Sequence, residues 1–192
     1  DILYKYDGEE WINMHEKYKE LQGLWFLDMI VDKNNTLWIA TLDSGIVTFN
    51  EGVDTTFKLT NSEIPSNTVF DIDIDENNDI WACFDEYKLD TSYGGLGKYD
   101  YNSWSVFTTL NSGIPMNVLQ FLQFDSEGNL YISFNPSFSP LIGYELVKYD
   151  GVNWDLIDIP YDHNLIEFVF DIQIDSLGNV VLATGSGVLF YN

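Results

Sequence analysis

Four aspartates lie in strand-like segments of this 192-residue sequence, where apolar residues alternate with them. In FDIDID, residues 70–75, Asp71 and Asp73 share one side of an extended strand because side chains alternate with a period of two. Asp28 and Asp171 occupy the position of Asp71 in two further segments of similar pattern. Carboxylate oxygens are the ligands that a hard cation such as calcium prefers, so these four residues form a candidate metal site. In the alternative interpretation each carboxylate is structural and accepts backbone N–H groups.

A second group of candidate residues lies in two long loop-like stretches, residues 84–94 and 134–144, which are rich in aromatic residues, with acidic residues in the first of them. Aromatic faces beside polar groups bind a sugar ring or a peptide, because they supply apolar area and hydrogen bonds together. In the alternative interpretation the aromatic rings fold back onto the protein and cap it. The candidate ligand-binding residues are Asp85, Glu86, Tyr87, Asp90, Tyr93, Phe134, Phe138 and Tyr144.

Motifs of established catalytic chemistry are absent from the sequence. The two histidines, His15 and His163, lie in no metal-binding spacing such as His-Glu-x-x-His, and there is no Gly-x-Ser-x-Gly elbow. Carboxylates suited to acid–base chemistry are plentiful, but an acidic chain has many of them whatever its function. We therefore assign no catalytic residue and no cofactor, and calcium is the one candidate ion.

The charge of the chain excludes several classes of partner. Asp and Glu number 31 against 8 Lys and Arg, which gives a net charge of −23. Such a surface repels phosphate groups, so nucleic acids and anionic membrane surfaces are excluded. No run approaches the ~18 apolar residues of a membrane-spanning helix, so direct membrane insertion is excluded too. Cys83, the only cysteine, lies in a strand-like run, where we expect a buried, inert thiol.

An internal repeat organises these residues. Four segments align without gaps, namely VDKNNTLW (31–38), IDENNDIW (74–81), FDSEGNLY (124–131) and IDSLGNVV (174–181). The aspartates at their second position are 43, 50 and 50 residues apart, a spacing typical of a four-stranded propeller blade. Each segment predicts a hairpin, in which a polar turn with Asn or Gly joins two apolar strands, A and B. We expect equivalent, buried positions six residues after each aspartate, at Trp38, Trp81, Tyr131 and Val181.

Two further strands complete each repeat. Strand C recurs at residues 3–8, 46–52, 96–102, 146–153 and 188–192, and strand D follows with Trp11, Phe57, Trp104 or Trp154. The sequence therefore predicts an all-β protein, a β-propeller of four-stranded antiparallel blades. Residues 15–22 are compatible with one or two helical turns, and we interpret them as a loop insertion between a strand D and the next strand A. The predicted units are strands C and D of a preceding blade (1–23), three blades (24–67, 68–117 and 118–167) and a partial blade (168–192).

The segments that connect strand D to the next strand A carry a family resemblance. TNSEIPSNTVFDI (60–72) and LNSGIPMNVLQFL (110–122), together with WIAT (38–41) and Gly94-Gly95-Leu96, resemble the two-component regulator propeller repeat. The resemblance covers nearly the whole chain. It implies a propeller that serves as an extracytoplasmic sensor domain, or as part of a secreted protein, in Bacteroidota-type bacteria. It thus implies an extracellular, cell-surface or periplasmic location, and it says nothing about the ligand.

Two functions follow as hypotheses. The first is a non-enzymatic binding or sensing domain that takes a glycan, a peptide or a partner protein on the loop face. The alternative is a propeller lyase or glycoside hydrolase that uses Asp and Glu residues of the same loops. The sequence has five C strands but four A strands, which predicts part of a larger propeller, with a self-contained four-bladed ring as the alternative. Its further partners are then the remaining blades, or a second copy that associates through the terminal blades.

Overall fold

The computed structural model describes residues 2–50, 52–85, 94–134, 146–157, 169–185 and 187–191. An N-terminal hairpin of β1 (Tyr4–Tyr6) and β2 (Trp11–Asn13) leads into a single helical turn, α1 (Met14–Lys17), and a short 3₁₀ turn, η1 (Lys19–Leu21). The insertion interpreted as a loop in residues 15–22 thus contains two short helical turns between β2 and β3. Among the residues just given, no helix has the length and hydropathy of a membrane span.

Four antiparallel sheets follow the hairpin, and in each of them strands that are consecutive in sequence are neighbours. They are the first blade, β3 (Phe26–Val31), β4 (Leu37–Thr41), β5 (Ile46–Phe49) and β6 (Val53–Phe57); the second blade, β7 (Thr68–Ile74), β8 (Ile80–Asp85), β9 (Gly95–Tyr99) and β10 (Trp104–Phe107); the third blade, β11 (Leu119–Phe124), β12 (Leu130–Phe134), β13 (Leu146–Tyr149) and β14 (Trp154–Ile157); and the fourth blade, β15 (Val169–Ile174), β16 (Val180–Thr184) and β17 (Gly187–Tyr191).

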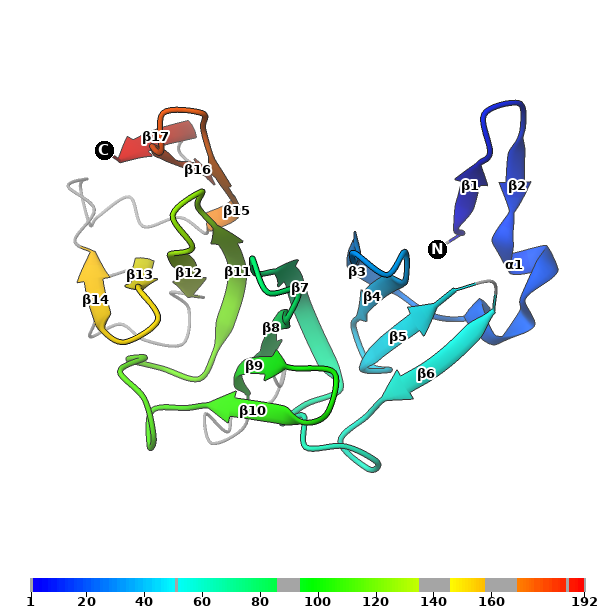
Figure 1. The fold of residues 1–192 in the computed structure, drawn as a ribbon, viewed down its shortest axis with the longest axis horizontal. Coiled ribbons are helices and arrows are strands. Elements are labelled where there is room, and N and C mark those ends of the chain that lie inside the picture. The colour runs from blue at the N-terminus through cyan, green and yellow to red at the C-terminus, as the bar shows by residue number, and fades with distance from the viewer. Residues whose placement is uncertain are drawn as a thin grey trace.

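The blades fan out around a common centre (Figure 1). Strands β3, β7, β11 and β15 lie nearest that centre, and later strands of each blade lie progressively further out. Neighbouring inner strands contact one another, β3 with β7, β7 with β11 and β11 with β15. The all-β fold predicted from the repeat, a β-propeller of four-stranded antiparallel blades, is therefore confirmed.

The repeat aspartate stabilises the turn between the first two strands of each blade. In the first blade Asp32 Oδ1 accepts the backbone N–H groups of Asn34 and Thr36, both at 2.8 Å. Its Oδ2 accepts the indole N–H of Trp38 at 2.9 Å. Asp75 holds its own turn in the same way and accepts the indole N–H of Trp81 at 3.1 Å. A buried carboxylate with this many donors fixes both the turn and the tryptophan rotamer.

The hydrophobic core lies between blades and not within them, because a sheet must bury its faces against other sheets. Between the first and second blades, Trp38 and Ile46 pack against Ile72, Ile80 and their neighbours. A similar cluster around Trp81, Leu122 and Ile132 joins the second and third blades. Trp38, Trp81 and Tyr131 are buried and Val181 is half-buried, at equivalent register positions, so the predicted register is confirmed. Cys83 is buried in β8, and burial raises the pKa of its thiol well above the usual value.

Candidate functional site

Each innermost strand contains a β-bulge at the same place. The pairing register shifts by one residue after Phe26 in β3, Val69 in β7 and Val169 in β15, and β11 has the same shift after Leu119. A bulge leaves one residue unpaired and re-aims its side chain, which is why bulges are frequent beside binding sites. In this fold the bulges place extra side chains on the strands nearest the centre of the fan.

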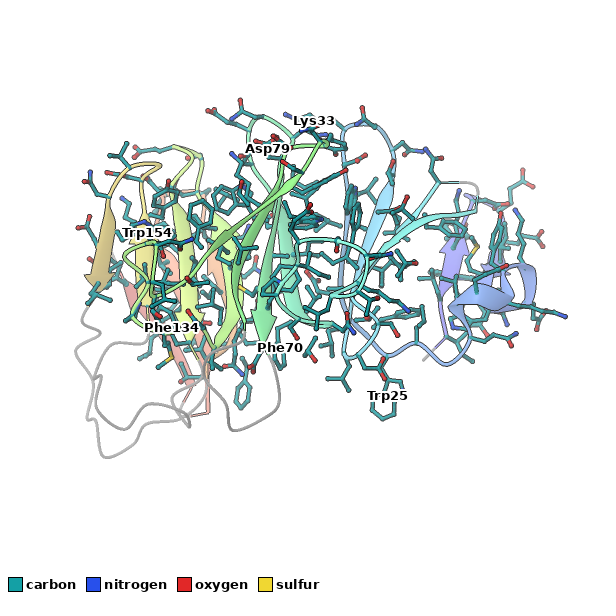
Figure 2. The ribbon with its side chains drawn as sticks, turned by 90° about the horizontal axis from the view of Figure 1, so that it is seen from below. Trp25, Lys33, Phe70, Asp79, Phe134 and Trp154 are labelled. Carbon is teal, nitrogen blue, oxygen red and sulfur yellow. The ribbon has the colours of Figure 1, made fainter. Side chains whose placement is uncertain are left out.

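The bulge residues are apolar in three blades, and we use the name axial mouth for these three residues together with one preceding tryptophan. Leu27 and Phe170 are exposed and Phe70 is half-buried, and each lies five residues before the repeat aspartate of its blade. Trp25, two residues before Leu27, is also exposed. Figure 2 shows Trp25 and Phe70 toward one edge of the molecule and Lys33 and Asp79, which belong to the hairpin turns, toward the opposite edge. The axial mouth and the hairpin turns are therefore separate faces.

The residue that follows each bulge ties neighbouring blades together. Asp28 Oδ2 accepts the backbone N–H of Ile72 at 3.1 Å, and Asp71 Oδ2 accepts that of Leu122 at 2.7 Å. Each carboxylate thus holds the inner strand of the next blade. Asp171, at the same position of the fourth blade, is exposed, and its oxygens lie 3.4 Å from the side-chain amide nitrogen of Gln173.

Asp71 is the most perturbed of these carboxyl groups. Burial, and then a hydrogen bond to Asp28 and the charge of Asp28, raise its pKa to about 9 against the opposing effect of the Leu122 N–H. At neutral pH Asp71 is therefore a neutral carboxylic acid that donates to the Asp28 carboxylate. Burial also raises the pKa of Asp73, whose Oδ2 accepts the Gln123 side-chain amide at 2.8 Å.

The described residues do not gather the predicted metal ligands into a cation site. No group of three or more His, Cys, Asp or Glu side chains with metal-binding geometry occurs in the part of the chain that the structure describes. Asp28 and Asp71 do lie together, hydrogen-bonded to each other, and the Oδ2 atom of each accepts a backbone N–H group of the next blade. These contacts favour the alternative interpretation, a structural carboxylate, and the metal site stays a prediction. Asp171 is two blades away from Asp71 along the array.

The predicted ligand-binding loops lie largely outside the described residues. Of the eight candidate residues, the structure describes Asp85 and Phe134. Phe134 is the last residue of β12, is 1% exposed and packs in the core between the second and third blades. Asp85 ends β8, is buried, and accepts the hydroxyl of Ser66 through its backbone oxygen at 2.5 Å. Both side chains are buried, and their role in ligand binding stays a prediction. Glu86, Tyr87, Asp90, Tyr93, Phe138 and Tyr144 stay predictions.

Comparison with known proteins rests on structure alone, since no family model and no curated protein matches the sequence. The extracellular domain of a hybrid two component system protein from B. thetaiotaomicron superposes with a TM-score of 0.67 at 16% identity, over 99% of this chain and 24% of that one. The fold is a β-propeller. Virginiamycin B lyase from Staphylococcus aureus superposes with a TM-score of 0.60 at 12% identity, over 85% of this chain and 54% of that one.

A third solved propeller of similar fold is a gluconolactonase from Xanthomonas campestris, with a TM-score of 0.57 at 13% identity over 85% of this chain and 57% of that one. The chain thus spans a quarter to about three fifths of these proteins. At such identities the likeness establishes the fold and not the activity, because one fold carries many functions.

Proposed function

We propose that this chain is part of an extracytoplasmic recognition propeller that binds a glycan or a peptide at the axial mouth and does not convert it. The observation that carries the proposal is the repeated bulge, which presents Leu27, Phe70 and Phe170 on the innermost strands beside hydrogen-bonding aspartates. Apolar faces next to polar groups suit a sugar ring or a peptide side chain. The fold shared with an extracellular domain of a two component system supports the sensing role and the location.

The hydrogen bonds that the carboxylates of the innermost strands accept support a binding function over a catalytic one. Asp28, Asp71 and Asp73 all accept backbone N–H groups of the next blade or of their own strand. A general acid or base has to exchange its proton with a substrate, whereas these groups hold the blades in place. The alternative is a lyase or hydrolase that uses loop Asp and Glu residues. Because a lyase and a lactonase are among the proteins of similar fold, the experiment also tests for conversion of the ligand.

The binding face is tested by paired variants and a panel of glycans and peptides. Phe70→Ala and Leu27→Ala each remove an apolar side chain from the axial mouth. Leu177→Ala is the matched control, because Leu177 is exposed on a hairpin turn at the opposite face. We expect the two mouth variants to weaken binding of any ligand found by titration calorimetry by about tenfold or more, and the control to leave it unchanged. Equal affinities in all three variants would place the ligand elsewhere.

We also propose that further blades pack on both ends of the array. The first-blade residue Met29 is 43% exposed, whereas its counterparts Ile72, Leu122 and Ile172 are 2%, 4% and 1% exposed. At the other end, Val188 is 60% exposed, whereas the matching residues Ile46, Leu96 and Leu146 are fully buried. An apolar residue that is buried in every interface between blades and bare at the array's ends marks a surface meant for another blade.

A cavity lies at the first end of the array, where a side chain of a preceding blade would pack. It measures about 660 Å³ and lies between the N-terminal hairpin and the first blade, where Leu3, Met14, Val31 and Phe49 line it. Their counterparts in the next interface are Ile46, Phe57, Ile74 and Tyr99, which surround Trp38. The cavity is thus the position of a strand-B aromatic side chain from a preceding blade.

Sedimentation and hydroxyl-radical footprinting of the 192-residue chain test this proposal. We expect either self-association at micromolar concentration or, in a monomer, strong labelling of Met29 and Val188. In a longer parent chain that carries the neighbouring blades, both residues become protected. A monomer of the isolated chain in which both are already protected would mean that the array closes on itself.

A further inference from the structure

The two complete interfaces between neighbouring blades differ at the face of the hairpin turns. In the first interface Tyr101, from the turn after β9, fills the space over Trp38. Its hydroxyl donates to Asp32 Oδ2 at 2.6 Å and accepts from the side-chain amide of Asn78 at 2.7 Å. One acceptor and one donor thus satisfy a phenol whose ring lies edge-on against the indole.

Tyr101 and Asn78, which together we call the plug, are both replaced by glycine in the second interface. Gly151 stands directly after Asp150 as Tyr101 stands after Asp100, and Gly128 stands three residues after the repeat aspartate as Asn78 does. The backbone is otherwise the same, because Tyr101, Asn78, Gly128 and Gly151 all have φ between +65° and +92°. A Cβ atom at Gly151 or at Gly128 meets no atom within 4 Å.

The exchange leaves a cavity of about 320 Å³ between the second and third blades, which is at the lower end of ligand-pocket sizes, ~300–1,000 Å³. Trp81 and Tyr149 line it, and Trp81 stacks on Phe107 with ring centroids 5.7 Å apart. The indole N–H of Trp81 donates to Asp75 Oδ2 at 3.1 Å, as that of Trp38 donates to Asp32. The aromatic wall and its carboxylate are therefore conserved between the two interfaces.

The cavity also offers the polar pair that a hydroxyl group needs. Lys98 Nζ lies 3.4 Å from Asp75 Oδ2 and 2.8 Å from Asp79 Oδ2, and it stands 5.0 Å from the centre of the Trp81 ring. Asp75 accepts where Asp32 accepts, and the Lys98 ammonium group beside it supplies the hydrogen-bond donor. The carboxylates Glu76, Glu127 and Asp150 also line the cavity. Their charge favours neutral and cationic ligands over anionic ones.

We infer that this cavity is a binding site for a phenol, whose ring takes the place of the Tyr101 ring and whose hydroxyl group bridges Asp75 and Lys98. The phenol is a small free molecule or the side chain of a tyrosine in a peptide. The site is on the opposite face from the axial mouth, so it stands independently of the function proposed above.

The indole N–H resonance of Trp81 in a ¹H–¹⁵N NMR spectrum reports on this site directly, and that of Trp38 is an internal control. We expect tyramine to shift the Trp81 resonance saturably and to leave Trp38 unchanged. Phenethylamine, which lacks only the hydroxyl group, binds at least about tenfold more weakly because Asp75 and Lys98 lose their shared partner. The expected order of affinity is tyramine, p-cresol and then 4-hydroxyphenylacetate, set by the acidic surroundings.

Variants close or preserve the cavity. Gly151→Tyr with Gly128→Asn rebuilds the plug of the first interface and abolishes tyramine binding, whereas Gly151→Asn tests the positive φ alone and retains binding. If the double variant does not fold, Lys98→Met serves in its place and weakens tyramine at least severalfold. Binding of an acetyl-Gly-Tyr-Gly-amide peptide more tightly than p-cresol assigns the site to peptides, and the reverse order to small phenols. An unshifted Trp81 resonance up to the solubility of tyramine, or equal affinities for tyramine and phenethylamine, overturns the inference.

Discussion

Replacing Asp71 by asparagine is expected to remove a pH dependence from the stability of this protein. Burial and the Asp28 carboxylate raise the pKa of Asp71 to about 9, from an ordinary value of 3.8. The native state therefore holds a proton between these two pH values that the unfolded chain has released. A group whose pKa is raised by folding contributes stability that is full below its unfolded pKa and is lost as the pH rises toward its folded pKa.

The size of the effect follows from proton linkage. One proton bound only by the native state lowers the free energy of unfolding by up to about 1.4 kcal/mol for each pH unit. Between pH 6 and pH 8 this group alone thus costs the wild-type protein roughly 2–3 kcal/mol. An asparagine side chain donates to Asp28 and accepts from the Leu122 N–H just as the protonated acid does, but it has no proton to lose. Asp71→Asn is therefore more stable than wild type at pH 8, and this advantage shrinks steadily as the pH falls toward the ordinary carboxyl pKa of 3.8.

Urea denaturation at pH 5, 6, 7 and 8 measures these slopes. Asp150→Asn is the control, because backbone and side-chain hydrogen bonds from Asn153 lower the pKa of Asp150 to about 2, so that it stays ionised throughout this range. We expect a shallower slope for Asp71→Asn alone. An identical slope in wild type and Asp71→Asn between pH 6 and pH 8 would show that Asp71 is ionised in the native protein, and the reasoning would fail.

Other substitutions test the remaining parts of the fold. Tyr101→Phe removes the 2.6 Å hydrogen bond to Asp32 and lowers the free energy of unfolding by about 1–2 kcal/mol at pH 7. Because folding lowers the pKa of Asp32, this destabilisation shrinks as the pH falls below 3.8, the ordinary pKa of the group. A destabilisation that stays constant down to pH 2 would contradict this. Gly45→Ala, whose Cβ overlaps the carbonyl oxygen of Phe57, costs more than about 3 kcal/mol. Gly178→Ala, with a similar φ but open space, costs about 1–2 kcal/mol, and equal losses in urea denaturation would rule out the steric explanation. Met29→Ser leaves the melting temperature nearly unchanged and reduces self-association in sedimentation, because that side chain is 43% exposed where its counterparts in the other blades are buried.

The blade architecture could be predicted from the sequence because it depends on local signals. The repeat aspartate, the Asn or Gly that tolerates a positive φ and the alternating strands recur in every blade, so Trp38 and Trp81 could be placed without coordinates. The bulges could not be predicted, since an extra residue in a strand changes no residue type. Their one trace is that Leu27, Phe70 and Phe170 share an offset from the repeat aspartate.

The candidate site was harder to predict because it depends on where strands end and on contacts between blades. The sequence predicts loops that begin at Phe84 and Phe134, whereas both residues, which share one offset from the repeat aspartate, are buried near the end of a strand B. The aspartates of FDIDID were correctly placed on one side of a strand. Their backbone partners Leu122 and Phe124 belong to the next blade, some 50 residues later, and no local pattern reveals them. The exchange of Tyr101 for Gly151 is visible in the aligned repeats, but its meaning depends on the Asp32 carboxylate of another blade.

The central claim, recognition without conversion, is tested most directly by one titration read in two ways. The protein is titrated with a panel of neutral and basic glycans and peptides, and each mixture is followed by calorimetry and then by chromatography for products. The account predicts saturable binding that Phe70→Ala weakens and Leu177→Ala does not, with every ligand recovered intact. Product that accumulates with the protein concentration, and that disappears when a single loop carboxylate is changed to its amide, would contradict the account and identify a propeller enzyme.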